Sequence, residues 1–478
     1  LPSKTHTSDT VLSVIDVAMD PANPRNLLAF VWDHSMPFGS GFLPPGAAGP
    51  YTGLYRTSDA GASWTRLDTI STSGLPNGLA MKRFSRGAVT WVTVGDKQAQ
   101  SVAFVAFTRT DSNRVTHYLT DDNFYGLYRS MDAGLTWTRL LDSTAKLPMG
   151  GTQGRDSANL TNGQGGYDLF LVANPKATPP EIYFGGIDVL RTTDLGATWT
   201  NITKGYSEYY VKSRREQHSD QHGLAFTAAA GGHDLLNVSD GGVYHTDDFG
   251  VTWEQYHGLP ITMCYAVEPW RAGMAGTPAT ITARDLKVIT GTQDNGSSEY
   301  GLGADTNFRW INHGDGGVAA SHPTIPANII TSKQLGVIFA RNSLDSMTGT
   351  PLTEMDSTHD QTARWHTITL NLLKSGYAPT DTNESVAFIP PIVLDERSPT
   401  HLYTGRCRVY QATIDWKDLQ STTWRKWSNI ICGNLSNDSL WYWGNIEAIA
   451  LGVRDTLGRP MIWAGGFSSS TGTARLFR

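Results

Sequence analysis

The chain alternates short apolar segments with turns that contain proline or asparagine. An apolar run, a turn and a second apolar run follow one another at residues 14–19 and 27–31, 168–173 and 182–186, and 392–395 and 402–405. Runs of this length, bounded by turn-forming residues, are typical of β-strands and too short for most helices. The pattern therefore predicts an all-β fold of many short strands.

Counting the units of this pattern along the chain gives eight. They are expected to begin near residues 12, 83, 168, 222, 264, 316, 388 and 446. The last unit ends at 476–478 without room for a fourth strand, and residues 1–11 are expected to supply that strand. Two long segments, 34–52 and 108–126, are rich in glycine, proline or polar residues and are expected to be loops.

A second repeat lies inside the first. Four segments share the pattern Ser/Thr-x-Asp-x-Gly-x-Ser/Thr-Trp, at residues 57–64, 130–137, 192–199 and 246–253. Two apolar or aromatic residues and then Arg or His precede each copy. The aspartate and glycine predict a tight turn, in which the carboxylate accepts backbone N–H groups and the glycine takes a positive φ. The tryptophan is expected to start the next strand and to pack between neighbouring sheets.

This motif is that of the Asp-box, or BNR, repeat, and the chain resembles the Asp-box β-propellers. That group includes sialidases, the xyloglucanases of glycoside hydrolase family 74 and sortilin-type receptors. The resemblance implies a single β-propeller domain over residues 1–478. The count of eight units favours eight blades, with seven as the alternative, and the N- and C-terminal strands are expected to close the ring. The resemblance also implies that the box lies at the outer rim of a blade. The aspartates Asp59, Asp132, Asp194 and Asp248 are therefore expected to hold turns rather than act as catalytic acids.

Composition narrows the classes of function. Forty-nine glycines and 15 tryptophans among 478 residues suit many short strands and turns. Charged residues make up 17%, the net charge is −6 and no basic run occurs, so nucleic acid is not an expected partner. No apolar stretch is long enough to span a membrane. A monomer with a carbohydrate substrate and no cofactor is expected.

Several features favour secretion. The sequence starts at Leu1 and is interpreted as a mature, processed form, located outside the cell. Seven glycosylation sequons begin at Asn159, Asn201, Asn237, Asn295, Asn383, Asn434 and Asn437. Of the three cysteines, Cys407 and Cys432 are a plausible disulfide pair, which leaves Cys264 free and, we expect, buried. No zinc-ligand spacing is present.

Candidate site residues are polar side chains beside glycines where strands should end. In propellers the innermost strands surround a central channel, and ligands bind at one of its mouths. The strongest segments are Trp32-Asp33-His34, 217–223 with Asp220 and His222, 291–296 with Gln293 and Asp294, and 313–317 with His313 and Asp315. Two weaker segments are 237–242, with Asp240, and 164–168. Segments 220–226, 239–244, 291–296 and 314–317 resemble segments that occur in the same order in secreted bacterial Asp-box proteins.

The first hypothesis is a glycoside hydrolase. Hydrolysis needs two carboxyl groups, one protonated and one ionised, and Asp33, Asp220, Asp294 and Asp315 come from different units and are expected to converge. Family 74 enzymes carry a catalytic aspartate just after an early inner strand, which resembles Asp33. Their following Gly-Gly is replaced here by His34-Ser35. Trp32, His34, Gln293, His313 and Asp240 are the expected substrate-binding residues.

Two alternatives remain open. A polysaccharide lyase acting on a uronate needs a base and a group that stabilises the enolate, and Tyr210, Arg214 and His222 are candidates for these roles. A carbohydrate- or protein-binding propeller would use the same polar and aromatic mouth without catalysis. A sialidase is disfavoured, because the Phe-Arg-Ile-Pro segment that usually accompanies sialidase Asp boxes is absent.

Overall fold

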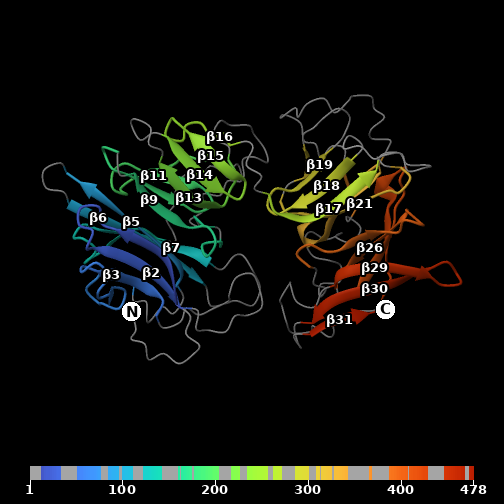
Figure 1. The fold of residues 1–478 in the computed structure, drawn as a ribbon, viewed down its shortest axis with the longest axis horizontal. Coiled ribbons are helices and arrows are strands. Elements are labelled where there is room, and N and C mark those ends of the chain that lie inside the picture. The colour runs from blue at the N-terminus through green and yellow to red at the C-terminus, as the bar shows by residue number, and fades with distance from the viewer. Residues whose placement is uncertain are drawn as a thin grey trace. The chain divides into compact units, whose positions relative to one another are not determined.

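The fold consists of antiparallel sheets that follow one another along the chain (Figure 1). A computed structural model describes residues 12–33, 51–76, 84–95, 100–110, 122–142, 160–161, 163–174, 177–203, 217–226, 234–256, 262–271, 286–300, 308–312, 314–325, 328–342, 365–368, 387–406, 408–428, 446–468 and 473–477. These residues form two compact units, Leu1–Leu259 and Pro260–Arg478. In Figure 1 the strands of the first unit run from blue to green and those of the second from yellow to red.

The first unit holds four sheets of four strands each, with neighbouring strands consecutive in sequence. Their strands are β1 (Leu12–Met19), β2 (Leu27–Asp33), β3 (Gly53–Thr57) and β4 (Thr65–Arg66); β5 (Phe84–Val94), β6 (Gln100–Thr110), β7 (Asp122–Ser130) and β8 (Thr138–Asp142); β9 (Phe170–Asn174), β10 (Glu181–Gly185), β11 (Val189–Thr192) and β12 (Thr200–Asn201); and β13 (Gln221–Phe226), β14 (Leu235–Ser239), β15 (Gly242–Thr246) and β16 (Glu254–Gln255).

The second unit repeats this plan in three four-stranded sheets and one of three strands. Its strands are β17 (Cys264–Arg271), β18 (Leu286–Thr292), β19 (Ser297–Tyr300) and β20 (Arg309–Asn312); β21 (Gly316–Ser321), β22 (Ile329–Lys333), β23 (Val337–Arg341) and β24 (His366–Thr367); β25 (Ile392–Leu394), β26 (His401–Gly405), β27 (Val409–Thr413) and β28 (Thr423–Lys426); and β29 (Ile446–Arg454), β30 (Pro460–Ser468) and β31 (Thr473–Phe477). Two short 3₁₀ helices, η3 (Gln334–Gly336) and η5 (Leu419–Ser421), connect strands.

These consecutive four-stranded antiparallel sheets are the blades of a β-propeller, so the predicted all-β propeller class is confirmed. Each of the eight expected starts lies within a few residues of the first strand of a sheet. The last sheet has three strands among the described residues, as predicted. Residues 1–11, expected to supply its fourth strand, lie outside the described part of the chain, so closure of one domain by the terminal strands stays a prediction.

Apolar side chains fill the space between successive sheets. Phe30 of the first sheet packs against Phe107 of the second with ring centroids 6.0 Å apart, and Phe124 of the second packs against Phe184 of the third at 5.5 Å. Each hydrophobic cluster in either unit joins two sheets that are consecutive in sequence. Burial of these aromatic side chains is the main force that stacks the sheets.

The four motif copies form one recurring turn, which we call the repeat turn. In the first copy, Asp59 accepts hydrogen bonds from the backbone N–H and hydroxyl of Ser63 at 2.9 and 2.6 Å, and from the Thr57 hydroxyl at 2.6 Å. Gly61 has φ of 91°. Those hydroxyl donors lower the pKa of Asp59. The aspartates therefore shape turns, as predicted. In each copy the tryptophan ends the turn directly before the fourth strand rather than starting that strand.

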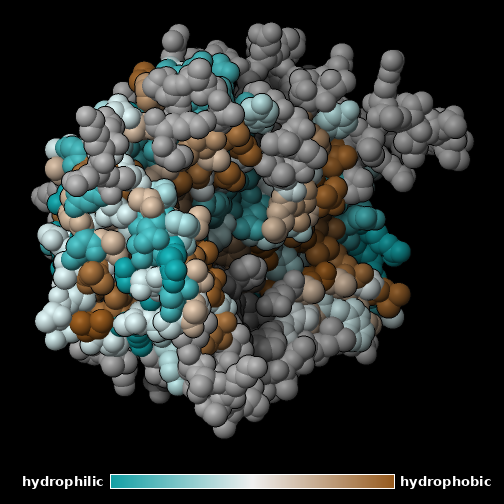
Figure 2. Space-filling model, turned by 60° about the vertical axis from the view of Figure 1, so that its left-hand side comes forward, coloured by the Kyte–Doolittle hydropathy of each residue, from teal (hydrophilic) through white to brown (hydrophobic). Residues whose placement is uncertain are grey.

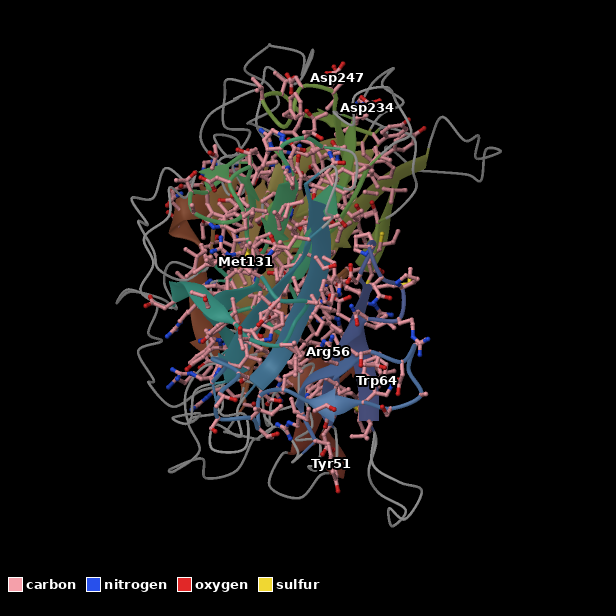
Figure 3. All side chains as sticks on the ribbon, turned by 90° about the vertical axis from the view of Figure 1, so that its left-hand side faces the viewer. Tyr51, Arg56, Trp64, Met131, Asp234 and Asp247 are labelled. Carbon is pink, nitrogen blue, oxygen red and sulfur yellow. The ribbon has the colours of Figure 1, made fainter. Side chains whose placement is uncertain are left out.

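In each of the first three sheets, a basic side chain that precedes the repeat turn connects that sheet to the repeat turn of the next sheet. Arg56 Nε donates to the Ala133 carbonyl at 2.8 Å, and Arg129 Nη1 donates to the Leu195 carbonyl at 3.0 Å. The Arg191 guanidinium instead lies 4.7 Å from the centroid of the Phe249 ring. Arg56, Trp64 and Met131 are labelled in Figure 3, where Arg56 and Trp64 lie beside the blue strands of the first sheet.

Apolar and polar residues are mixed on the part of the described surface that Figure 2 presents. Figure 2 shows brown apolar groups bordered by white and teal residues on the face that it presents. Among the described residues, no helix is both long and apolar enough to cross a bilayer. Cys264 is exposed at the start of β17, so the expectation that it is buried is wrong. Cys407 and Cys432 lie outside the described residues.

Candidate functional site

Acidic residues recur at one end of several sheets. Asp168, Asp220 and Asp315 each lie just before the first strand of a sheet, whereas Asp240 and Asp294 follow the second strand. Because those two strands are antiparallel neighbours, the start of the first and the end of the second meet at the same end of the sheet. The topology therefore gathers carboxyl groups within each unit.

In the first unit, Gln164 joins two of these carboxyl groups. Its Nε2 donates to Asp168 Oδ2 at 2.8 Å and to Asp220 Oδ1 at 3.0 Å. Asp168 precedes the sheet that starts with β9, and Asp220 precedes the sheet that starts with β13. The amide side chain thus connects the beginnings of two consecutive sheets.

Asp240 lies beside this pair in a different environment. The Tyr167 hydroxyl donates to Asp240 Oδ1 at 2.9 Å, and His222 Nε2 lies 2.5 Å from the same oxygen. The rings of Tyr167 and His222 meet edge to face, with centroids 4.7 Å apart. One oxygen of Asp240 therefore contacts both the phenol and the imidazole.

Exposure to solvent differs among four members of this group: Tyr167, His222, Asp240 and Asp168. Tyr167 is 39% exposed, and the side chains of His222 and Asp240 are 30% and 6% exposed. Asp168 is completely buried. The group therefore runs from a solvent-facing tyrosine and histidine down to a buried aspartate.

Burial controls the protonation of Asp168 and Asp220. Burial, followed by the nearby charge of Asp220, raises the pKa of Asp168 strongly. Burial, followed by the charge of Asp240, raises the pKa of Asp220 by a smaller amount. Asp220 also has a positive φ of 64°, and its backbone oxygen accepts the Asp240 N–H at 3.3 Å. The backbone thereby holds Asp220 and Asp240 side by side.

The guanidinium of Arg86 acts on the charge of Asp168 and lies beside this group. Its Nη1 donates to the carbonyl of Tyr167 at 2.5 Å and to that of Gly166 at 3.3 Å. Burial lowers its pKa, although the charges of Asp168 and Asp16 act in the opposite direction. Arg86 therefore fixes the backbone that carries Tyr167.

Trp32 and Asp33, two of the site residues predicted from the sequence, lie at the end of β2. Asp33 is buried, its Oδ2 accepts the Tyr51 N–H at 3.1 Å, and its N–H donates to the Thr52 hydroxyl at 3.0 Å. These contacts hold the start of β3 against β2. Trp32 is half-buried.

A second group lies in the second unit. Asp315 Oδ1 accepts the Asp294 N–H at 3.1 Å and the Tyr265 hydroxyl at 3.3 Å. Burial and then the charge of Asp315 raise the pKa of Tyr265. Gln293 donates its N–H to the Met263 carbonyl at 2.9 Å, next to this group. The structure thus brings Asp294 and Asp315 together, and their catalytic role stays a prediction.

Several expected residues fall outside the described part of the chain: His34, Tyr210, Arg214 and His313. The structure brings Asp220, Asp240 and His222 together. The expected site set missed Asp168, Gln164 and Tyr167, which lie in a segment ranked as weaker. Its Gly165-Gly166 pair directly before an aromatic residue, an aspartate and a strand was the available signal. No group of three or more metal-binding side chains occurs within the described residues.

Comparisons with known proteins return likeness of shape only. No protein-family model and no curated protein matches the sequence. YCF48 from Cyanidioschyzon merolae is 10% identical, with a TM-score of 0.30, over 83% of this chain and 92% of that one. An ancestral GH74 enzyme is 12% identical, with a TM-score of 0.29, over 97% of this chain and 46% of its own.

The extracellular domain of BT4673 from B. thetaiotaomicron is 12% identical, with a TM-score of 0.25, over 99% of this chain and 55% of that one. The chain thus spans about half the length of the last two proteins. The chain is a β-propeller protein with clustered carboxyl groups at the ends of its sheets. Its own strands and hydrogen bonds show this.

Proposed function

We propose that the protein is a secreted, monomeric carbohydrate-active enzyme that hydrolyses glycosidic bonds, with Asp220 and Asp240 as its two carboxyl groups. We also propose that it belongs with the Asp-box propellers, since four repeat turns carry their motif and its hydrogen bonds. In this proposal, a carboxyl pair at a sheet end acts on a polysaccharide or oligosaccharide.

The contrast between the two carboxyl groups carries the proposal. Asp220 is in a desolvated position that raises its pKa and favours its protonated form, whereas Asp240 accepts a hydrogen bond from the Tyr167 hydroxyl and lies 2.5 Å from His222 Nε2. Hydrolysis of a glycosidic bond requires this division between a proton donor and a carboxylate. Backbone contact between Asp220 and Asp240 keeps the two groups adjacent.

The proposed roles follow from these environments. Asp220 donates its proton to the leaving glycosidic oxygen as that bond breaks. Asp240 faces the positive charge that develops on the sugar ring, either directly or through an activated water. Tyr167 and His222, the most exposed members of the group, offer ring surfaces against which a sugar packs.

A second candidate rests on the contact between His222 and Asp240. A carboxylate that fixes one nitrogen of a histidine leaves the ring oriented for proton transfer at the other nitrogen. His222 would then be the base that removes the proton next to a uronate carboxylate. This lyase leaves a double bond in its product, whereas the hydrolase does not.

The test is a panel of plant, algal and microbial polysaccharides incubated with the pure protein. New reducing ends without ultraviolet absorbance support hydrolysis, and both signals together support the lyase. Asp220→Asn and Asp240→Asn should each strongly reduce turnover in a folded protein. Asp247→Asn is the matched control, because Asp247 is exposed in a repeat turn and is labelled in Figure 3. Full activity of both site variants would overturn the assignment.

A further inference from the structure

Asp168 is a buried carboxyl group that the proposed hydrolysis does not use. Its side chain is completely buried, and Oδ1 has no hydrogen-bond partner within the described residues. An ionised carboxylate in such a position would lack the donors that normally offset its desolvation. The geometry therefore favours a neutral, protonated Asp168 in the folded protein.

The charges that face this carboxyl group come from several elements. Asp220 and Asp240 belong to the ends of β13 and β14, and Arg86 belongs to β5. His218 and His222 face Asp220. Arg86 already donates to two backbone oxygens. The carboxyl groups in this group therefore outnumber the cations that can neutralise them.

A single amide nitrogen connects the two carboxyl groups. Gln164 Nε2 has two hydrogens, one for Asp168 Oδ2 and one for Asp220 Oδ1. This arrangement holds while the pair carries one proton, because only one negative charge then lies at the bridge. When both groups ionise, two negative charges share one neutral donor in a desolvated setting and repel each other.

We propose that Asp168, Gln164 and Asp220 form a proton-dependent link between the sheets that begin with β9 and β13, which stays closed while the pair keeps a proton and opens when both carboxyl groups ionise. Asp168 and Gln164 are thus positioning residues that act through Asp220. The link regulates the site of the proposed function and rests on that proposal only for its effect on turnover. The released proton goes to solvent.

The direction of the pH effect follows from linkage. A carboxyl group whose pKa is raised on folding stabilises the fold fully only below its unfolded pKa, near 4, and that stability is lost as the pH rises towards the folded pKa. In this window each pH unit raises the unfolding equilibrium constant about tenfold for one such group. The link therefore weakens on the alkaline side.

The experiment measures urea unfolding of the full chain from pH 4 to 9 for the wild type, Asp168→Asn and the control Asp247→Asn. Asparagine keeps the shape and cannot ionise. We expect the wild type and the control to lose stability relative to Asp168→Asn as the pH rises, by about tenfold in unfolding constant per unit. Parallel curves for wild type and Asp168→Asn would overturn the proposal.

Asp220→Asn provides a second test if Asp168→Asn does not fold. It removes one of the two charges, so the alkaline loss of stability should again shrink, and an unchanged loss would overturn the link.

Turnover gives an independent readout. If the hydrolase proposal is right, wild-type activity falls at alkaline pH and Asp168→Asn shifts that limb upward. If no substrate is turned over, only the proposed function fails, and the unfolding curves still decide the link.

Discussion

Gly291 in β18 lies so close to Gly317 in β21 that a Cβ atom on Gly291 would be 1.9 Å from the Gly317 carbonyl oxygen. The two strands belong to consecutive sheets of the second unit. Their backbones approach each other without an intervening side chain. Asp294 and Asp315 lie within three residues of these two glycines along the chain.

Gly291→Ala should therefore destabilise the protein, because the obstacle is backbone and cannot rotate away. Overpacking of this kind costs about 1–3 kcal/mol. Urea unfolding of the variant measures the loss. Gly223→Ala in β13 is the matched control, since a Cβ there meets nothing within 4 Å and its effect should be small. Equal stability of the two variants would contradict this account.

Arg56→Met should weaken the contact between the first two sheets. The variant keeps an unbranched side chain but removes the hydrogen bonds to the Ala133 carbonyl and to Asn26 Oδ1, the latter 3.2 Å long. Loss of a partner for a partly buried carbonyl costs about 1–2 kcal/mol. Arg459→Met is the control, because that arginine side chain is 62% exposed and pairs only locally with Asp455. Thermal unfolding of both variants checks the difference.

Asp220→Asn and Asp240→Asn should each reduce kcat on any hydrolysed substrate by about 10²–10⁴-fold, the usual contribution of a general acid or base. KM should change much less, because each variant keeps the size and most hydrogen bonds of the side chain. Initial rates at several substrate concentrations separate the two constants. A fall confined to KM would assign these aspartates to binding and remove them from the chemistry.

Glycosylation should be absent at two of the seven sequons. Asn237 is fully buried and donates to Gln217 and Gln221, and Asn201 is 8% exposed and donates to Asp188. A glycan on either Nδ2 would require these contacts to break. Mass spectrometry of the protein secreted from a eukaryotic host should find unmodified peptides at both positions. Occupancy at Asn237 in folded protein would contradict the packing described here.

The sequence predicted local features well because each depends on a few neighbouring residues. The repeat turns follow from an aspartate, a glycine and two hydroxyl groups within eight positions, as Asp59 shows. The starts of the sheets follow from runs of apolar residues. The turn motif and the apolar runs can both be recognised from the sequence, whatever tertiary structure surrounds them.

The site was harder to predict because it depends on which sheet ends meet. In the sequence, Asp168 has the pattern of an ordinary strand start. Its place in the site comes from Gln164, whose amide joins it to Asp220, 52 residues further along the chain. Likewise, no local pattern distinguishes Asp33, which fastens a neighbouring strand, from Asp240, which faces a histidine and a tyrosine. Only the arrangement of sheets separates these roles.

The links made by Arg56, Arg129 and Arg191 all run in one direction, each from its own sheet to the turn of the next. Within the first unit each sheet is therefore coupled most directly to its immediate neighbours, as in a linear array of repeats. A local opening at one sheet would then propagate stepwise rather than melt the unit at once. Amide hydrogen exchange should accordingly show protection that changes from sheet to sheet, with the lowest values at whichever link is weakest.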